Sequence, residues 1–132
     1  MFKYYKDTIF YYYNYYNFGD FFMKEEIKTH LFNSEEEALN VLKSSRERID
    51  KLDNDFINII YERTSLADSI VKAKTYLDMD VYDANRENHV FQKAENLAKK
   101  KNIDQDKLNQ IMKLLVDLSK DRQKRILDDL DY

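Results

Sequence analysis

The chain has 132 residues, enough for one domain and too few for two. It contains one glycine and no proline, which disfavours a turn-rich β fold. It has no cysteine and only two scattered histidines, which excludes disulfides, a cysteine nucleophile, and metal clusters bound by thiolates or histidines. Charged residues make up 36% of the sequence, but the net charge is only −3. This mixed balance argues against a nucleic-acid binder. The sequence contains no run of about 18 apolar residues, so no membrane span is expected.

Residues 1–22 differ from the rest of the chain. They hold 12 of the 19 aromatic residues, their charges cancel, and they show no helical period. They also lack the aliphatic stretch and small-residue site of a secretory signal. We therefore expect residues 1–33 to be an aromatic-rich extension, disordered or partly ordered, before a functional domain at 34–132. The alternatives are a tail that binds a membrane interface or a partner, and a true start at Met23.

A long helix is predicted from about residue 35 to about residue 77. Ser34 followed by Glu37 is the pattern of a capping box, and the acidic residues 35–37 suit the positive end of a helix dipole. Apolar residues then recur at helical spacing with no glycine or proline between them. They are Leu42, Ile49, Leu52, Phe56, Ile59, Ile60, Leu66, Ile70 and Leu77.

This helix is too long for a domain of this size to cover. At 1.5 Å per residue it spans roughly 65 Å. A compact domain of this length is only about 35 Å across. Most of the apolar stripe therefore needs another cover, and a second copy of the chain is the simplest one.

Two shorter helices follow a polar connection at residues 78–85. The second helix ends at about Lys101, where Asn102 is a plausible stop, and Asp104 is a plausible N-cap for the third. The predicted fold is therefore all-α, with three helices per chain in an intertwined homodimeric bundle. The apolar residues that mark the two shorter helices are Val90, Phe91, Ala94, Leu97 and Ala98, then Leu108, Ile111, Met112, Leu115, Leu118, Ile126 and Leu130.

Several polar residues lie on these apolar stripes. A buried unpaired charge is very costly, so each of them must reach solvent, pair with another residue or meet a ligand. Taken singly, a long side chain that reaches solvent is the simpler explanation. Taken together, three cations, one acid and two neutral hydrogen-bonding groups predict a pocket for a small dianion, because arginine binds carboxylates through two parallel hydrogen bonds. The six residues are Arg46, Arg63, Lys74, Glu87, Ser119 and Gln123.

Helix geometry divides the three cations between two sites. Arg63 and Lys74 are 11 residues apart, so they lie within about 20° of the same helix face and roughly 16 Å apart along the axis. Arg46 points about 100° away from Arg63 and lies roughly 25 Å from it. Arg46 cannot reach the same small ligand as Arg63 of its own chain, but it could reach the site of a partner helix packed antiparallel. The sequence therefore predicts a homodimer with shared sites.

Other motifs are weak or absent. The chain has no glycine-rich phosphate loop, no Ser-His-Asp set and no HExxH motif. A heptad spacing along the first helix allows a simpler alternative, a non-catalytic helical dimerisation module in which the cations reach solvent separately. The heptad positions are Leu42, Ile49, Phe56, Arg63, Ile70 and Leu77.

Four stretches together resemble the all-helical chorismate mutases, the AroQ class or type II. They are RERIDKLD from Arg46, YERTSLADSIVKAK ending at Lys74, VYDANRE ending at Glu87, and SKDRQ ending at Gln123. The resemblance covers about residues 39–128 without a gap. Each fragment alone is weak, but six functional positions at fixed spacings make the match specific.

The resemblance implies an isomerase of the shikimate pathway. It would convert chorismate to prephenate by a Claisen rearrangement, in phenylalanine and tyrosine biosynthesis, with no cofactor, no metal and no covalent intermediate. It would be a cytoplasmic homodimer of three-helix chains with two shared active sites, without nucleic-acid or membrane partners.

The resemblance also assigns the residues that would bind the reacting part of the substrate. Arg63 would bind one carboxylate and the partner subunit's Arg46 the other. Lys74 would bridge a carboxylate and the ether oxygen, to which Gln123 would also donate. A pericyclic reaction needs no nucleophile, so orientation and positive charge near the breaking C–O bond are what such a pocket can supply.

The remaining implied contacts lie around the substrate ring. Glu87 would hold the ring hydroxyl, helped by the backbone of Asp83, and Ser119 would lie against a carboxylate. Arg86 falls on a family arginine and is a weaker candidate for direct contact. An isochorismate-pyruvate lyase on the same scaffold is the closest alternative, although the intact Arg86–Glu87 pair and Ser119 look more like the mutase.

Overall fold

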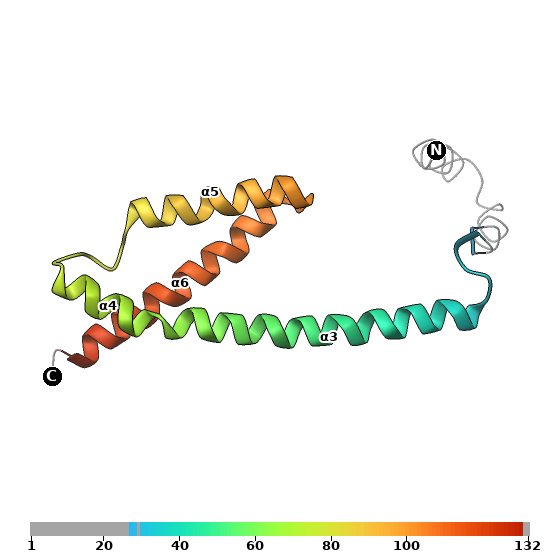
Figure 1. Cartoon of the computed structure of the whole chain (residues 1–132), viewed down its shortest axis with the longest axis horizontal. Helices are drawn as coiled ribbons and strands as arrows, with labels where there is room; N and C mark the ends of the chain where they lie inside the picture. The colour runs from blue at the N-terminus through green and yellow to red at the C-terminus, as the bar shows by residue number, and fades with distance from the viewer. Residues whose placement is uncertain (1–26, 29, 131–132) are drawn as a thin grey trace, which may run out of the picture. The chain divides into compact units, whose positions relative to one another are not determined.

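A computed structural model describes residues 27–28 and 30–130 of the chain (Figure 1). The described residues form helices and no strand, which confirms the predicted all-α class. The predicted extension lies largely outside the described residues, so the division at residue 34 stays a prediction. The chain separates into two units, Met1–Lys51 and Leu52–Tyr132. The helices are α3 (Glu35–Ser65), α4 (Ala67–Tyr76), α5 (Ala84–Lys101) and α6 (Gln105–Leu130).

The first described long helix, α3, begins with half of the predicted capping box. The backbone N–H of Glu37 donates to Ser34 Oγ at 3.1 Å, as predicted. The Glu37 carboxylate, however, accepts from the backbone N–H and the side-chain amide of Asn33, at 2.8 and 3.0 Å. Asn33 offers two donors where the backbone of Ser34 offers one, so the carboxylate is drawn one residue further back.

The long helix predicted over residues 35–77 is present as two segments on either side of Leu66. The backbone of Leu66 stays in the right-handed helical region, with φ −67° and ψ −14°, and its carbonyl accepts from the N–H of Ile70 at 3.0 Å. Just before the interruption, Ser65 Oγ donates to the carbonyl of Glu62 at 2.7 Å. A hydroxyl that bonds a helix carbonyl in this way competes with the backbone ladder and favours a local bend.

The turn between α5 and α6 follows the predicted stop and start signals. Asn102 takes the left-handed conformation, with φ 55° and ψ 44°, and the N–H of Ile103 donates back to the carbonyl of Ala98 at 2.9 Å. Asp104 Oδ1 then accepts from the N–H of Lys107 at 2.9 Å, which caps α6. Both predicted signals are confirmed, and they fix how α6 folds back along α5.

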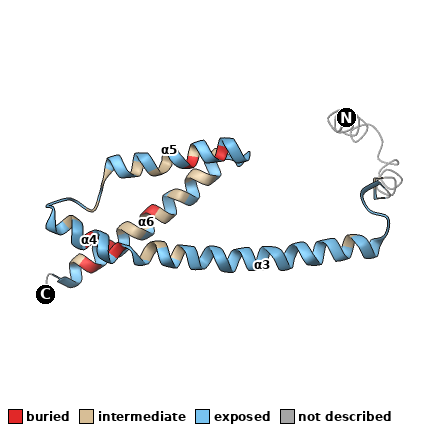
Figure 2. Ribbon diagram, in the orientation of Figure 1, coloured by how far each residue is buried: buried red, intermediate tan, exposed pale blue. Residues whose placement is uncertain are grey.

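The core of the second unit is small. α6 packs against both α4 and α5, and the few buried positions lie on these three helices (Figure 2). The small residues among the buried ones allow the helix backbones to approach closely. One buried residue, Gln123, is polar. The buried set consists of Ala67, Val71, Ala94, Ala98, Val116, Gln123 and Ile126.

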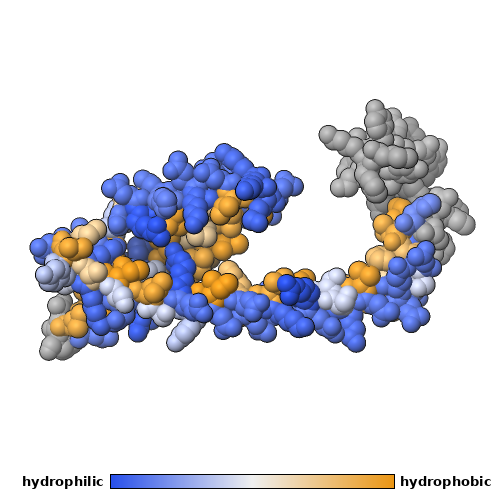
Figure 3. All heavy atoms as spheres, in the orientation of Figure 1, coloured by the Kyte–Doolittle hydropathy of each residue, from blue (hydrophilic) through white to orange (hydrophobic). Residues whose placement is uncertain are grey.

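No residue of α3 is buried. The stripe residues Leu52, Phe56 and Ile59 are between 45% and 59% exposed, and apolar side chains lie open along this helix in Figure 3. The expectation that the chain leaves most of its own apolar stripe uncovered is therefore confirmed. Among the described residues, no helix is long and apolar enough to span a membrane.

Candidate active site

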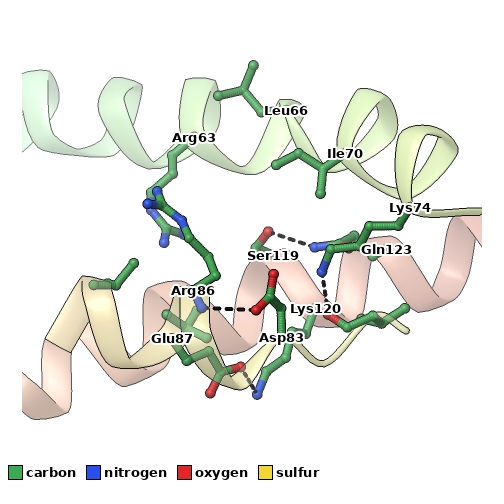
Figure 4. Close-up of a pocket in the computed structure, with 13 residues that line it drawn as sticks. Arg63, Leu66, Ile70, Lys74, Asp83, Arg86, Glu87, Ser119, Lys120 and Gln123 are labelled. Atoms are coloured by element: carbon green, nitrogen blue, oxygen red, sulfur yellow. Dashed lines mark hydrogen bonds and ion pairs between the residues drawn. The ribbon is translucent and has the colours of Figure 1, made fainter. Parts of the chain in front are cut away.

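A pocket of about 350 Å³ lies in the second unit, lined by the end of α3 and by α4, α5 and α6 (Figure 4). Its volume is in the range of small-molecule sites. Apolar side chains such as Ile70, Val90 and Val116 form part of its wall. Its polar lining residues are Arg63, Lys74, Asp83, Arg86, Glu87, Ser119, Lys120 and Gln123.

The pocket brings together six of the seven residues that the sequence predicted for the site. The exception is Arg46, which is exposed and lies in the first unit, in a separate hollow lined by residues of α3. Its assignment to a partner's site stays a prediction, as do the substrate contacts of the other six.

Lys74 is held by the way in which α4 ends. Asp78 takes a left-handed conformation with φ 55°, and the N–H of Met79 donates to the carbonyl of Lys74 at 2.8 Å. This turn reverses the chain, so that the carbonyl of Val81 accepts from Lys74 Nζ at 2.6 Å. A neutral carbonyl therefore orients the ammonium group without neutralising its charge.

Arg63 is held in the same manner from the end of α3. Its Nη1 donates to the backbone carbonyl of Leu115 on α6 at 2.6 Å. Burial lowers the pKa of the Arg63 guanidinium from its usual value, and the positive charge of Arg86 lowers this pKa further. An arginine nevertheless stays protonated in a protein. Two positive charges thus face the same small space, where an anion between them would relieve the repulsion.

Both carboxylates of the pocket are engaged by local partners. Asp83 caps α5, since its Oδ1 accepts from the backbone N–H of Arg86 at 2.9 Å. Glu87 Oε1 lies 2.8 Å from Lys120 Nζ. The side chains of the other cations are left without an acidic partner: within residues 27–28 and 30–130, neither Arg63, Lys74 nor Arg86 forms an ion pair.

Ser119 and Gln123 supply the neutral hydrogen-bonding groups. Gln123 Nε2 donates to Ser119 Oγ at 3.3 Å. The Gln123 side chain is buried, with 4% of the residue exposed, and its Oε1 has no hydrogen-bond partner among the residues that the structure describes. Because buried polar atoms are normally paired, this amide has hydrogen-bonding capacity that a ligand can use.

Lys120 is the pocket residue that sequence reasoning missed. A signal was present, because Lys120 lies four residues after Val116 and three before Gln123, the same spacing that singled out its neighbours. Because Lys120 lies within a run of charged residues, the pattern around it is also typical of a solvated helix surface. Arg86, which the sequence placed as a weaker contact, also lines the pocket.

The pocket therefore offers binding and orientation rather than a nucleophile. Four cations and two carboxylates give it a formal charge of +2, which suits a small dianion. Ser119 has no histidine beside it in the lining to act as a base. Within the described part of the chain, no group of three His, Cys, Asp or Glu side chains could hold a metal.

The fold and pocket define a small all-helical protein with a net positive pocket. The family model for chorismate mutase type II matches residues 45–124, a span that holds every predicted site residue. The chain belongs to this family and is an isomerase.

Individual relatives agree with this assignment. The chain is 31% identical over 84 residues to a chorismate mutase of Methanocaldococcus jannaschii, which covers 64% of this chain and 85% of that protein. It is 27% identical over 89 residues to a bifunctional chorismate mutase/prephenate dehydratase of Buchnera aphidicola subsp. Schizaphis graminum, covering 67% of this chain and 23% of that enzyme. A solved structure, a conserved hypothetical protein from Pyrococcus furiosus, matches with a TM-score of 0.51 and 30% identity, covering 63% of this chain and 95% of that one.

The unpaired cations lead to a first prediction. Lys74→Ala and Arg63→Ala should each lower kcat/KM for chorismate by about 10²-fold or more, because each removes a positive donor from a partly desolvated site. Lys72→Ala is the matched control: Lys72 lies on the same helix as Lys74, with its side chain 57% exposed and paired with Asp68, and should stay within about twofold. Circular dichroism should show an unchanged fold. Wild-type rates in Lys74→Ala would remove Lys74 from the site.

Proposed function

We propose that this chain converts chorismate to prephenate in the pocket described above, by a Claisen rearrangement without cofactor or covalent intermediate. The observation that carries the proposal is that Arg63, Lys74 and Arg86 line one small pocket and that none of them has a carboxylate partner among the described residues. Chorismate carries two carboxylates, so the substrate supplies counter-charges that the described part of the chain does not. A cytoplasmic location stays a prediction of the sequence.

The reacting atoms of the substrate lie against Lys74 and Gln123 in this proposal. The Lys74 ammonium has three donors, and one is used by the carbonyl of Val81. Its other donors bridge a substrate carboxylate and the ether oxygen, while Arg63 holds the carboxylate nearer to α6. The Gln123 amide, turned over about its terminal bond, donates to the ether oxygen. Negative charge builds on that oxygen as the C–O bond breaks, so both donors bind the transition state more strongly than the substrate.

The ring of the substrate is held by the start of α5 and by α6. Glu87 accepts a hydrogen bond from the ring hydroxyl, and its own N–H donates to the carbonyl of Asp83 at 3.0 Å. Ser119 lies against a carboxylate. These contacts fix the ring while the cations fix the enolpyruvyl arm over it, and such orientation lowers the barrier of an intramolecular rearrangement.

A direct assay tests the proposed function. Purified protein is given chorismate and, separately, isochorismate, and the products are followed by absorbance and chromatography. We expect chorismate to be consumed with prephenate as the product, and isochorismate to yield no pyruvate. Pyruvate release from isochorismate with chorismate left intact would instead identify a lyase.

The active form that we propose is an intertwined homodimer in which the partner subunit's Arg46 completes each site. Two observations support it. Apolar residues of α3, among them Leu42, Ile49 and Leu52, are about half exposed, and burying the exposed half of each would contribute about 1 kcal/mol. Arg46 itself is exposed and, among the residues that the structure describes, forms no ion pair.

Mixing two inactive variants tests the shared site. In an Arg46→Ala/Lys74→Ala heterodimer, one pocket keeps its own Lys74 and receives an intact Arg46, while the other pocket lacks both. Random re-pairing of equal amounts should therefore restore about a quarter of the wild-type activity, since half of the dimers then hold one intact site of two. The control is a mixture with Lys74→Ala and Arg63→Ala, both in the same pocket, which should restore none. No recovery in the first mixture would contradict the shared site.

The neutral amide of Gln123 predicts the pH dependence. An amide donates at any pH, so we expect kcat/KM not to fall above about pH 6 through this contact. In Gln123→Glu the carboxyl must be protonated to donate, so this variant should be active below the pKa of the new carboxyl and lose activity above it. Burial raises this pKa and moves the loss to higher pH. Gln92→Glu, at an exposed position of α5, should keep the wild-type profile. A wild-type profile in Gln123→Glu would argue against the contact.

A further inference from the structure

Lys120 on α6 is held by three groups at one edge of the pocket. Its Nζ lies 2.8 Å from Glu87 Oε1 on α5 and 3.6 Å from Asp117 Oδ1 on its own helix. It also lies 5.6 Å from the centre of the Tyr82 ring, a distance at which an aromatic face attracts a cation. The ammonium group therefore has a defined position rather than a mobile one.

The Lys120–Glu87 pair differs from the other ion pairs of the described residues. The pairs Lys72–Asp68 and Lys113–Asp117 each lie within one helix, and their side chains are between 38% and 70% exposed. Lys120 and Glu87 join two helices, and their side chains are only 23% and 20% exposed. Solvent screens such a pair less, so it can fix geometry in a way that a surface pair does not. The hydrogen bond that Lys120 donates to Glu87 is the largest cause that raises the pKa of Lys120, although burial opposes it.

A carboxylate in this pocket has competing partners. Arg63, Lys74 and Arg86 line the same space and have no acidic partner among the described residues. Each of them would attract the Glu87 carboxylate if the Glu87 side chain were free to turn. A Glu87 carboxylate paired with one of them would cancel a charge that the substrate needs, and would also leave the ring hydroxyl without an acceptor.

We propose that Lys120 is a positioning residue that holds Glu87 at the ring-hydroxyl end of the pocket and away from the substrate-binding cations. This inference rests on the proposed function, because it assigns Lys120 to the recognition of the same substrate. Lys120 acts through Glu87 and not on the reacting atoms, so its loss should weaken binding of substrate and transition state alike.

A double-mutant cycle tests the proposal. Lys120→Met removes the charge and keeps an unbranched stem, and it should raise KM for chorismate about tenfold with kcat changed less than about threefold. Lys120→Arg should restore most of the affinity, because it restores the charge. In a Glu87→Gln background the Lys120→Met change should cost less than about twofold, since the group that it positions is already neutral. Lys113→Met is the control, because Lys113 also pairs with Asp117 but has its side chain 70% exposed.

The outcomes separate the two proposals. A wild-type chain that leaves chorismate unchanged would overturn the proposed function and this inference together. An active wild type with a KM unchanged in Lys120→Met, or with the same loss in the Glu87→Gln background, would overturn this inference alone. If Lys120→Met does not fold, Lys120→Gln replaces it in the same experiment, with the same expected outcomes.

Discussion

The cost of holding the positive charge of Arg63, which is partly buried and faces Arg86, is the constraint on which the site depends. Burial disfavours the charged form of Arg63 and lowers its pKa, and the positive charge of Arg86 lowers this pKa further. Within residues 27–28 and 30–130, no carboxylate pairs with Arg63 or Arg86 to relieve this cost. The chain anchors Arg63 to the carbonyl of Leu115 and Lys74 to the carbonyl of Val81. A carbonyl orients a cation through its dipole but carries no net charge, so the full positive charge remains available to a bound dianion.

The two carboxylates of the pocket have other partners, so they do not neutralise the substrate-binding cations. Asp83 is committed to the N-terminus of α5, where its oxygen caps the helix. Glu87 is committed to Lys120. Each acid thus has a partner of its own: Asp83 bonds the first turn of α5, and Glu87 pairs with a lysine on α6. Positive charge and hydrogen-bond acceptors can then occupy one small cavity without neutralising one another, which is what a substrate with two carboxylates and a hydroxyl requires.

The sequence predicted the parts of this arrangement that depend on spacing along one helix. Arg63, Lys74 and Gln123 were identified because a polar residue on an apolar stripe is conspicuous, and Asn102 and Asp104 because caps have local signatures. The interruption at Leu66 was not predicted, since the apolar period is the same on both sides of it. The sequence pattern also did not predict which side chains make contacts between helices. The anchoring carbonyls carry no side-chain signal, and the partner of Lys120 lies on another helix within a run that looks like a solvated surface.

In the proposed dimer, stability and catalysis depend on the same face of α3. Arg46 lies four residues after Leu42 and three before Ile49, and both of these apolar residues are about half exposed in the single chain. Helical spacing therefore places the arginine among the side chains whose burial would drive association. A partner chain that covers Leu42 and Ile49 must also receive the guanidinium between them. Burying that charge is costly unless an anion meets it, so the assembly that stabilises the fold and the substrate that occupies the pocket favour each other.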